Sequence, residues 1–219
     1  HEIMNSAIPI TNMVSMERRI LLKNGERPRE ITGLSGEETE DLMESLSTAE
    51  SRSQGLAKFV ETTRSLSRIP EPKFGDIHVK DLFHRMEKLF KTDLEKAGIQ
   101  LNVVMEPEHL LVKADQDLIE QVLINLLRNA MDALEGVSKP AIDLSGHKTP
   151  QGGMVVRVCD NGKGISRENL EQVFVPFYST KKKGSGIGLS LSLQIMKLHK
   201  GRIDLQSEEG QGTCVSLEF

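Results

Sequence analysis

The sequence lacks most of the features that assign a chain to a specialised class of protein. It has no tryptophan and only one tyrosine, so we expect an aliphatic core. No apolar run approaches the roughly 18–20 residues that a membrane-spanning helix needs. No signal peptide is recognisable, and a net charge of -4 gives no electrostatic footprint for nucleic acid. We therefore expect a globular protein that contacts neither a membrane nor nucleic acid.

Cysteine is scarce, and the sequence does not begin with methionine. Cys159 and Cys214 each lie in a short apolar run with the pattern of a strand. We expect buried, reduced thiols in preference to a disulfide, and hence a reducing compartment. Because the first residue is His1, we expect a cytoplasmic fragment whose upstream portion, with any sensory region or inner-membrane anchor, lies outside the sequence.

The first 69 residues have the pattern of two long helices. A break at residues 24–28, which contains glycine and proline, separates them. Apolar residues in the second stretch, 37–69, recur at alternating three- and four-residue steps, as in a coiled-coil seam. A single hairpin cannot bury both stripes, so we expect residues 1–69 to form a homodimeric four-helix bundle. A monomeric hairpin packed on the rest of the chain is the alternative.

Two prolines in Pro70-Glu71-Pro72 indicate a stiff linker over residues 70–75. Beyond it, residues 76–219 mix helical and strand-like patterns, which predicts an α+β protein. The expected elements are helices at about 83–94, 115–134 and 187–199, and strands at 99–103, 141–145, 154–159, 202–206 and 214–219.

Three polar residues share one face of the helix expected at 115–134. Asn125, Asn129 and Asp132 lie four and then three residues apart. An amide oxygen is a hard, neutral ligand suited to Mg²⁺. A lone asparagine in a helix is usually only solvated, but two on one face of an otherwise apolar helix favour a metal-binding role.

Two glycine-rich segments could approach a nucleotide closely. In residues 160–165 (DNGKGI), Asp160 follows a strand-like run and could accept a hydrogen bond from an exocyclic amine. Residues 184–189 (GSGIGL) run into a helix, where backbone amides suit phosphate oxygens. Three lysines at 181–183 could steer a triphosphate. Each motif alone is weak, because an ordinary turn or a solvated charged surface has the same composition.

Taken in order, these motifs resemble the boxes of the sensor histidine kinase ATP-binding domain, of the gyrase, Hsp90, kinase and MutL superfamily. Residues 125–130 resemble the N box, 160–164 the first glycine box, 174–178 the F box beside the ATP lid, 184–189 the second glycine box and 210–213 the closing glycine motif. The resemblance implies an α/β sandwich of the Bergerat fold that binds ATP and Mg²⁺. It implies that Asn129, with Asn125 as a second candidate, binds Mg²⁺ and that Asp160 reads the adenine amino group. The implied nucleotide-binding residues are Asn125, Asn129, Asp132, Asp160, Gly162, Gly164, Ile165, Phe177, Thr180, Lys181, Gly184, Ser185, Gly186, Ile187, Gly188, Leu189 and Thr213.

The opening residues, HEIMNS, resemble the H box of the family's dimerisation and phosphotransfer hairpin. The resemblance implies that His1 is the phospho-acceptor, with Glu2 and Asn5 as its catalytic neighbours. The commoner sequence of the family has Arg-Thr-Pro after the start of the box, whereas this sequence has Asn5 and its proline at position 9. The implied activity is ATP-dependent autophosphorylation of His1 and transfer to an aspartate of a response-regulator receiver domain in two-component signalling. Phosphatase activity toward that partner is left open.

Asn125 separates this interpretation from its nearest alternative. Superfamily members that hydrolyse ATP have a glutamate at this position, and an amide is a poor base for activating water. A gyrase- or Hsp90-like ATPase is therefore disfavoured. A dimeric scaffold that binds nucleotide without transferring phosphate is the other alternative.

Overall fold

The computed structural model describes residues 22–23, 27–28, 39–53, 69–150, 152–181 and 185–219. The chain divides into two units, His1–Arg68 and Ile69–Phe219. In the described part of the chain, no helix combines the length and the apolar character needed to cross a membrane.

The first unit contributes few described residues. β1 (Leu22–Lys23) and β2 (Arg27–Pro28) pair antiparallel around the expected break between two helices. Residues 39–53 form a helix inside the stretch expected to be the second one. The predicted catalytic residues His1, Glu2 and Asn5 lie outside the described residues. The four-helix bundle therefore remains a prediction.

The second unit is built on a five-stranded sheet with the order β4-β6-β7-β9-β8. β4 and β6 are parallel, and the other neighbouring pairs are antiparallel. A separate two-stranded sheet pairs β3 with β5. The strands are β3 (Gly75–His78), β4 (Gln100–Glu106), β5 (Leu111–Ala114), β6 (Ala141–Lys148), β7 (Met154–Asp160), β8 (Arg202–Glu208) and β9 (Gly212–Glu218).

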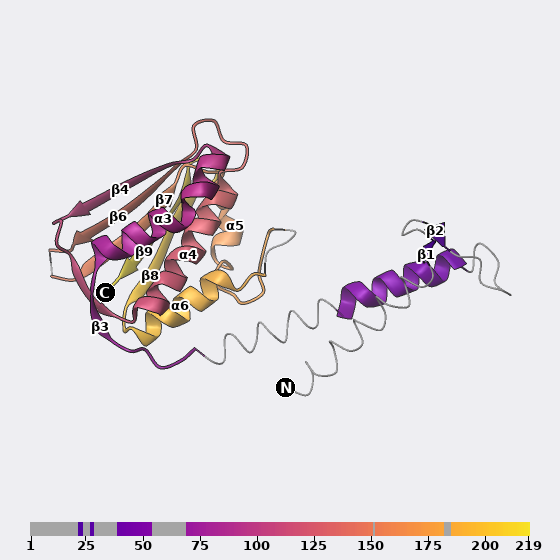
Figure 1. Cartoon of the computed structure of the whole chain (residues 1–219), viewed down its shortest axis with the longest axis horizontal. Helices are drawn as coiled ribbons and strands as arrows, with labels where there is room; N and C mark the ends of the chain where they lie inside the picture. The colour runs from indigo at the N-terminus through magenta and orange to yellow at the C-terminus, as the bar shows by residue number, and fades with distance from the viewer. Residues whose placement is uncertain (1–21, 24–26, 29–38, 54–68, 151, 182–184) are drawn as a thin grey trace. The chain divides into compact units, whose positions relative to one another are not determined.

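Helices cover one face of the large sheet and complete a two-layer sandwich (Figure 1). They are α3 (Val79–Ala97), α4 (Gln116–Ala133), the short α5 (Arg167–Leu170) and α6 (Gly188–Leu198). α4 lies against α3, α6 and β7, so it is the central helix of the layer. The α+β class and the sandwich expected from the sequence are both confirmed.

The sandwich is stabilised by aliphatic side chains. They alternate along each strand and form a stripe along each helix. On β6, Ile142 and Leu144 alternate with exposed or half-buried neighbours and are fully buried, as alternation in a strand requires. α4 buries a broad apolar stripe, which leaves only a narrow face for its polar residues. The core is thus aliphatic, with Phe83 and Phe90 of α3 as its buried aromatic residues among those described.

The start of α4 is fixed by its cap. The Asp115 carboxylate accepts the backbone N–H of Leu118 at 3.1 Å and that of Lys73 at 2.7 Å. Burial opposes the charge of Asp115, but these backbone hydrogen bonds and nearby His199 lower its pKa below the ordinary aspartate value. His199, at the end of α6, accepts the N–H of Asp115 at 2.9 Å through Nε2. The helix that carries the N box is therefore anchored both to the chain before β3 and to α6.

The expectation of reduced thiols is wrong for this structure. Cys159 on β7 and Cys214 on β9 are register partners, with 4.0 Å between their Cα atoms, and they form a disulfide. The sequence shows two strand-like runs but not which residues face each other across them. The inferred reducing compartment therefore loses its basis.

Candidate nucleotide-binding site

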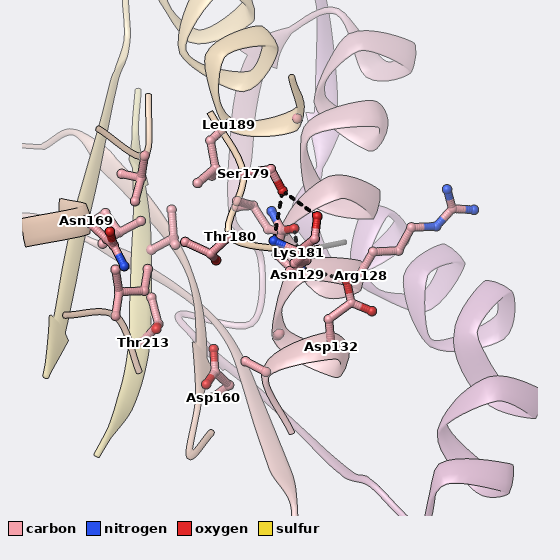
Figure 2. Close-up of a pocket in the computed structure, with 18 of the residues that line it drawn as sticks. Arg128, Asn129, Asp132, Asp160, Asn169, Ser179, Thr180, Lys181, Leu189 and Thr213 are labelled. Atoms are coloured by element: carbon pink, nitrogen blue, oxygen red, sulfur yellow. Dashed lines mark hydrogen bonds and ion pairs between the residues drawn. The ribbon is translucent and has the colours of Figure 1, made fainter. Parts of the chain in front are cut away.

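A pocket of about 570 Å³ lies between α4, the ends of β7 and β9, and the segment that leads into α6. Asn129 and Asp132 approach it from α4, Asp160 from β7 and Thr213 from β9 (Figure 2). Its predicted lining residues come from motifs far apart in the sequence. The fold brings them together because α4 packs directly on β7 and α6.

The polar face of α4 lines this pocket. The Oδ1 atom of Asn129 accepts a hydrogen bond from the Lys181 ammonium at 3.1 Å, and Asp132 forms an ion pair with the same ammonium at 2.6 Å. Asn125 uses its side chain differently, because its Nδ2 donates to Ser192 Oγ of α6 at 3.0 Å. Asn129 thus presents its amide oxygen to a cation, whereas Asn125 joins two helices.

The glycine-rich entry to α6 fits closely against α4. A Cβ atom on Gly188 would lie 1.8 Å from Asn125 Oδ1, so this position accepts no side chain without displacing the asparagine. α6 has no acidic residue in its first turn, which leaves the positive end of its dipole unopposed there. This end of the pocket therefore suits an anionic group.

Asp160 is partly buried at the other end of the pocket. Burial raises the pKa of its carboxyl above the ordinary aspartate value, although the backbone N–H groups of Gly162 and Thr213 and the charge of Lys181 act in the opposite direction. Its Oδ1 accepts the Gly162 N–H at 2.9 Å, which fixes the orientation of the carboxyl. The second carboxyl oxygen therefore has a defined direction and can accept a hydrogen bond from a bound group.

The segment between β7 and α6 closes the pocket at one side. The Phe177 N–H donates to Gly186 O at 2.8 Å, which joins the F box to the second glycine box. Gly186 has a φ of 68°, and a Cβ there would lie 2.5 Å from the carbonyl carbon of Phe177. Tyr178 donates its hydroxyl hydrogen to Asn169 Oδ1.

The structure brings most of the predicted nucleotide residues to one pocket. Those that line it are Asn125, Asn129, Asp132, Asp160, Gly164, Ile165, Thr180, Lys181, Ser185, Gly186, Gly188, Leu189 and Thr213. Gly162, Phe177 and Ile187 lie beside the lining and shape its backbone, and Gly184 lies outside the described residues.

Some lining residues escaped the sequence analysis. Val158 and Val215 provide an apolar wall, and each lies two residues from a predicted site residue on the same strand face. The period of two in a strand could have identified them. Asn169 lies on the four-residue helix α5 and belongs to no motif, so no sequence signal pointed to it.

The fold and the pocket are similar to those of a known class of nucleotide-binding domain. Residues 114–219 match the family model of histidine kinase-, DNA gyrase B- and HSP90-like ATPases. The catalytic domain of the histidine kinase ThkA has a similar structure, with a TM-score of 0.61 and 30% identity over 67% of this chain and 95% of that one.

The ThkA domain, 30% identical and covered to 95%, shows the family, and curated relatives agree with it. The sensor histidine kinase ZraS of Klebsiella oxytoca is 33% identical over 164 residues, which are 74% of this chain and 35% of that protein. Sporulation kinase C of Bacillus subtilis is 33% identical over 142 residues, which are 61% of this chain and 32% of that protein. The chain belongs to the sensor histidine kinase family, as the motifs implied. It spans about a third of the length of these curated relatives.

Proposed function

We propose that the pocket binds ATP with Mg²⁺ and that the chain transfers the γ-phosphoryl group to a ring nitrogen of His1. The observation that carries this proposal is the convergence of three chemically different groups on one cavity. These are the amide oxygen of Asn129, the carboxyl of Asp160 and the glycine-rich start of α6. Separately each has a structural explanation, but together they match the metal, the base and the phosphates of one nucleotide.

At the adenine end, the Asp160 carboxyl would accept the exocyclic amino group. The Gly162 N–H already holds one carboxyl oxygen, so the other is oriented before the nucleotide arrives. Val158 and Val215 add apolar surface beside it on which the flat base can pack. The solved structure of ShkA, which is 19% identical and therefore similar in fold alone, is in complex with AMPPNP.

At the phosphate end, the residues fit a hard cation. Asn129 Oδ1 accepts a hydrogen bond from an ammonium in the structure, so its oxygen is directed at a position that a cation can fill. When bound, Mg²⁺ would neutralise charge on the transferring phosphate. Asn129 would hold it, and the α6 amides would bind the phosphate oxygens.

The transfer step itself needs little covalent chemistry from the pocket. A neutral imidazole nitrogen of His1 would attack the γ-phosphorus, the bond to the bridging oxygen would break, and ADP would leave with the electron pair. Glu2 would orient the imidazole. Asn125 is an amide that is committed to Ser192, so it offers no base to activate water. ATP would thus be reserved for the histidine.

The phosphoryl group would then pass to an aspartate of a response-regulator receiver domain. The solved structure of ThkA with the response regulator TrrA, at 23% identity, shows such a partner for that kinase. For this chain we likewise propose a response-regulator partner and a homodimer. We also propose that Asn5 takes part in dephosphorylating the partner.

The test is incubation with γ-labelled ATP and Mg²⁺, followed by acid treatment of the labelled protein. Wild type should acquire acid-labile label, and His1→Ala should acquire none while it binds ATP with unchanged affinity. His84→Ala, which changes an exposed histidine of α3, is the matched control and should label normally. Label that persists in His1→Ala would overturn the assignment.

A further inference from the structure

Lys181 connects the segment before α6 to the polar face of α4. Its ammonium lies 3.1 Å from Asn129 Oδ1 and 2.6 Å from Asp132 Oδ2, and the three residues are labelled in Figure 2. The lysine side chain is 34% exposed, so it is largely withdrawn from solvent. It is thus an ordered cation at the wall of the nucleotide pocket.

This ammonium lies where the proposed function places the metal ion on Asn129. The proposed function assigns Asn129 Oδ1 to Mg²⁺, and in the structure the lysine nitrogen uses that oxygen. An ammonium has three N–H donors, and two of them are engaged by Asn129 and Asp132. No hydrogen bond of the third donor is found among the described residues, so it can point at a phosphate oxygen.

The charge of the pocket explains why a cation is needed there. Asp132 and Asp160 both line it, and a triphosphate would add further negative charge. The charge of Lys181 also reaches Asp160, where it acts against the rise in pKa that burial causes. Arg128 and Lys163 also line the pocket, but Lys181 is the cation that contacts Asn129 and Asp132, beside which the phosphates are proposed to lie.

We propose that Lys181 is a positioning residue that substitutes for the metal on Asn129, so that the ammonium and Mg²⁺ compete for one oxygen. This inference rests on the proposed nucleotide site and adds a role to it. Before the metal arrives, the lysine neutralises the site and offers a donor to the phosphates. When the metal occupies Asn129, the ammonium is released and only its ion pair with Asp132 remains available.

The inference predicts a specific dependence of binding on metal. Wild type should bind ATP measurably in EDTA, and more tightly in Mg²⁺. Lys181→Met should weaken binding in EDTA by about tenfold or more, the usual effect of losing a charge-assisted hydrogen bond. In saturating Mg²⁺ the loss should be several-fold smaller, because the metal takes over at Asn129. The dissociation constant of ATP in EDTA divided by that in Mg²⁺ is therefore larger for Lys181→Met than for wild type.

Calorimetric titration of ATP into the full chain, with Mg²⁺ or with EDTA, measures this ratio without any phosphoryl transfer. Lys181→Arg keeps a cation with several donors and should restore most of the binding in EDTA. Lys163→Met changes another lysine of the pocket, whose side chain has no hydrogen bond to Asn129 or Asp132 among those the structure describes. Any loss that it causes should be the same in both conditions.

The outcomes separate this inference from the proposed function. If wild type binds ATP in Mg²⁺ but Lys181→Met leaves the ratio unchanged, or if wild type binds nothing in EDTA, Lys181 does not substitute for the metal. An equal loss in both conditions would mean that the lysine only stiffens the segment, and it would also overturn the inference. If wild type fails to bind ATP even in Mg²⁺, the proposed function itself is wrong.

Discussion

At the scale of single residues, the site depends on positions where a side chain is absent. A Cβ on Gly162 would lie 2.6 Å from the carbonyl oxygen of Ala133, at the end of α4. A Cβ on Gly212, which has a φ of 110°, would lie 2.0 Å from the carbonyl oxygen of Asp160. These glycines let α4 and β9 close around Asp160. They explain why glycine recurs in motifs whose proposed ligand contacts are made by other residues.

Asp160 illustrates a conflict between function and stability. Because burial raises its folded-state pKa, the carboxyl contributes stability when protonated and loses that contribution as the pH rises through the folded pKa. At pH 7 the ionised carboxylate therefore costs stability. Asp160→Asn should raise the melting temperature of the nucleotide-free protein at pH 7, and the difference should shrink as the pH falls toward the acid range, where Asp160 is protonated.

The same substitution should weaken ATP binding by about tenfold, because the neutral amide replaces a charge-assisted hydrogen bond with an ordinary one. Thermal unfolding across pH and calorimetric titration with ATP and GTP measure the two effects. A variant that binds both nucleotides as wild type does would show that Asp160 does not read adenine. A lower melting temperature at pH 7 would show that burial is not the dominant influence on the carboxyl.

At the scale of elements, the contact between α4 and α6 determines whether the pocket exists. Asn125 donates to Ser192 at 3.0 Å, and Ser192 in turn donates to the Gly188 carbonyl at 2.9 Å. These bonds hold the N-box helix against the glycine-rich start of α6. The metal-binding and phosphate-binding ends of the proposed site are thus joined by side chains that need not touch the nucleotide.

Gly188→Ala tests this contact directly. The new methyl group would overlap Asn125, and overpacking of this kind costs about 1–3 kcal/mol, more than the gain in helix propensity. We expect a lower melting temperature and weaker ATP binding. Gly75→Ala is the matched control, because nothing lies within 4 Å of its added Cβ and its φ is not positive. Normal stability and normal binding in Gly188→Ala would show that the two helices can separate without harm to the site.

At the scale of the whole molecule, the structure describes most of the second unit and little of the first. The second unit contains the described core and the pocket, whereas the first contains the predicted hairpin, most of it outside the described residues. Its apolar stripes need a partner surface, and a second copy of the hairpin provides one.

We therefore expect the full chain to be a homodimer and a fragment of residues 69–219 to be a monomer. The fragment begins at residue 69 so that Lys73 keeps its hydrogen bond to Asp115. Light scattering of both samples over a range of concentrations measures their masses. A monomeric full chain would remove the support for the bundle, and a dimeric fragment would move the interface to the ATP-binding unit.

The sequence by itself predicted the class of fold, the family and about half of the residues that line the pocket. Helices expected at 115–134 and 187–199 correspond to α4 (Gln116–Ala133) and α6 (Gly188–Leu198), because apolar periodicity reports which face of a helix is buried. The glycine motifs were recognisable because close backbone approach restricts residue type locally. The four-residue strands β3 and β5 were missed, because they are too short to show a period and pair with each other across the chain.

Only the tertiary structure decided which residues face one another. The order of the sheet, the pairing of Cys159 with Cys214, the apolar wall of the pocket and the bond from Lys181 to Asn129 all join segments distant in sequence. Periodicity describes how each segment divides between core and solvent, but it contains no information about the register or the partner of that segment. Packing of the whole core settles both, and it also settles which side chains of α4 are contacted by Lys181, a lysine that the sequence had already indicated as a site residue.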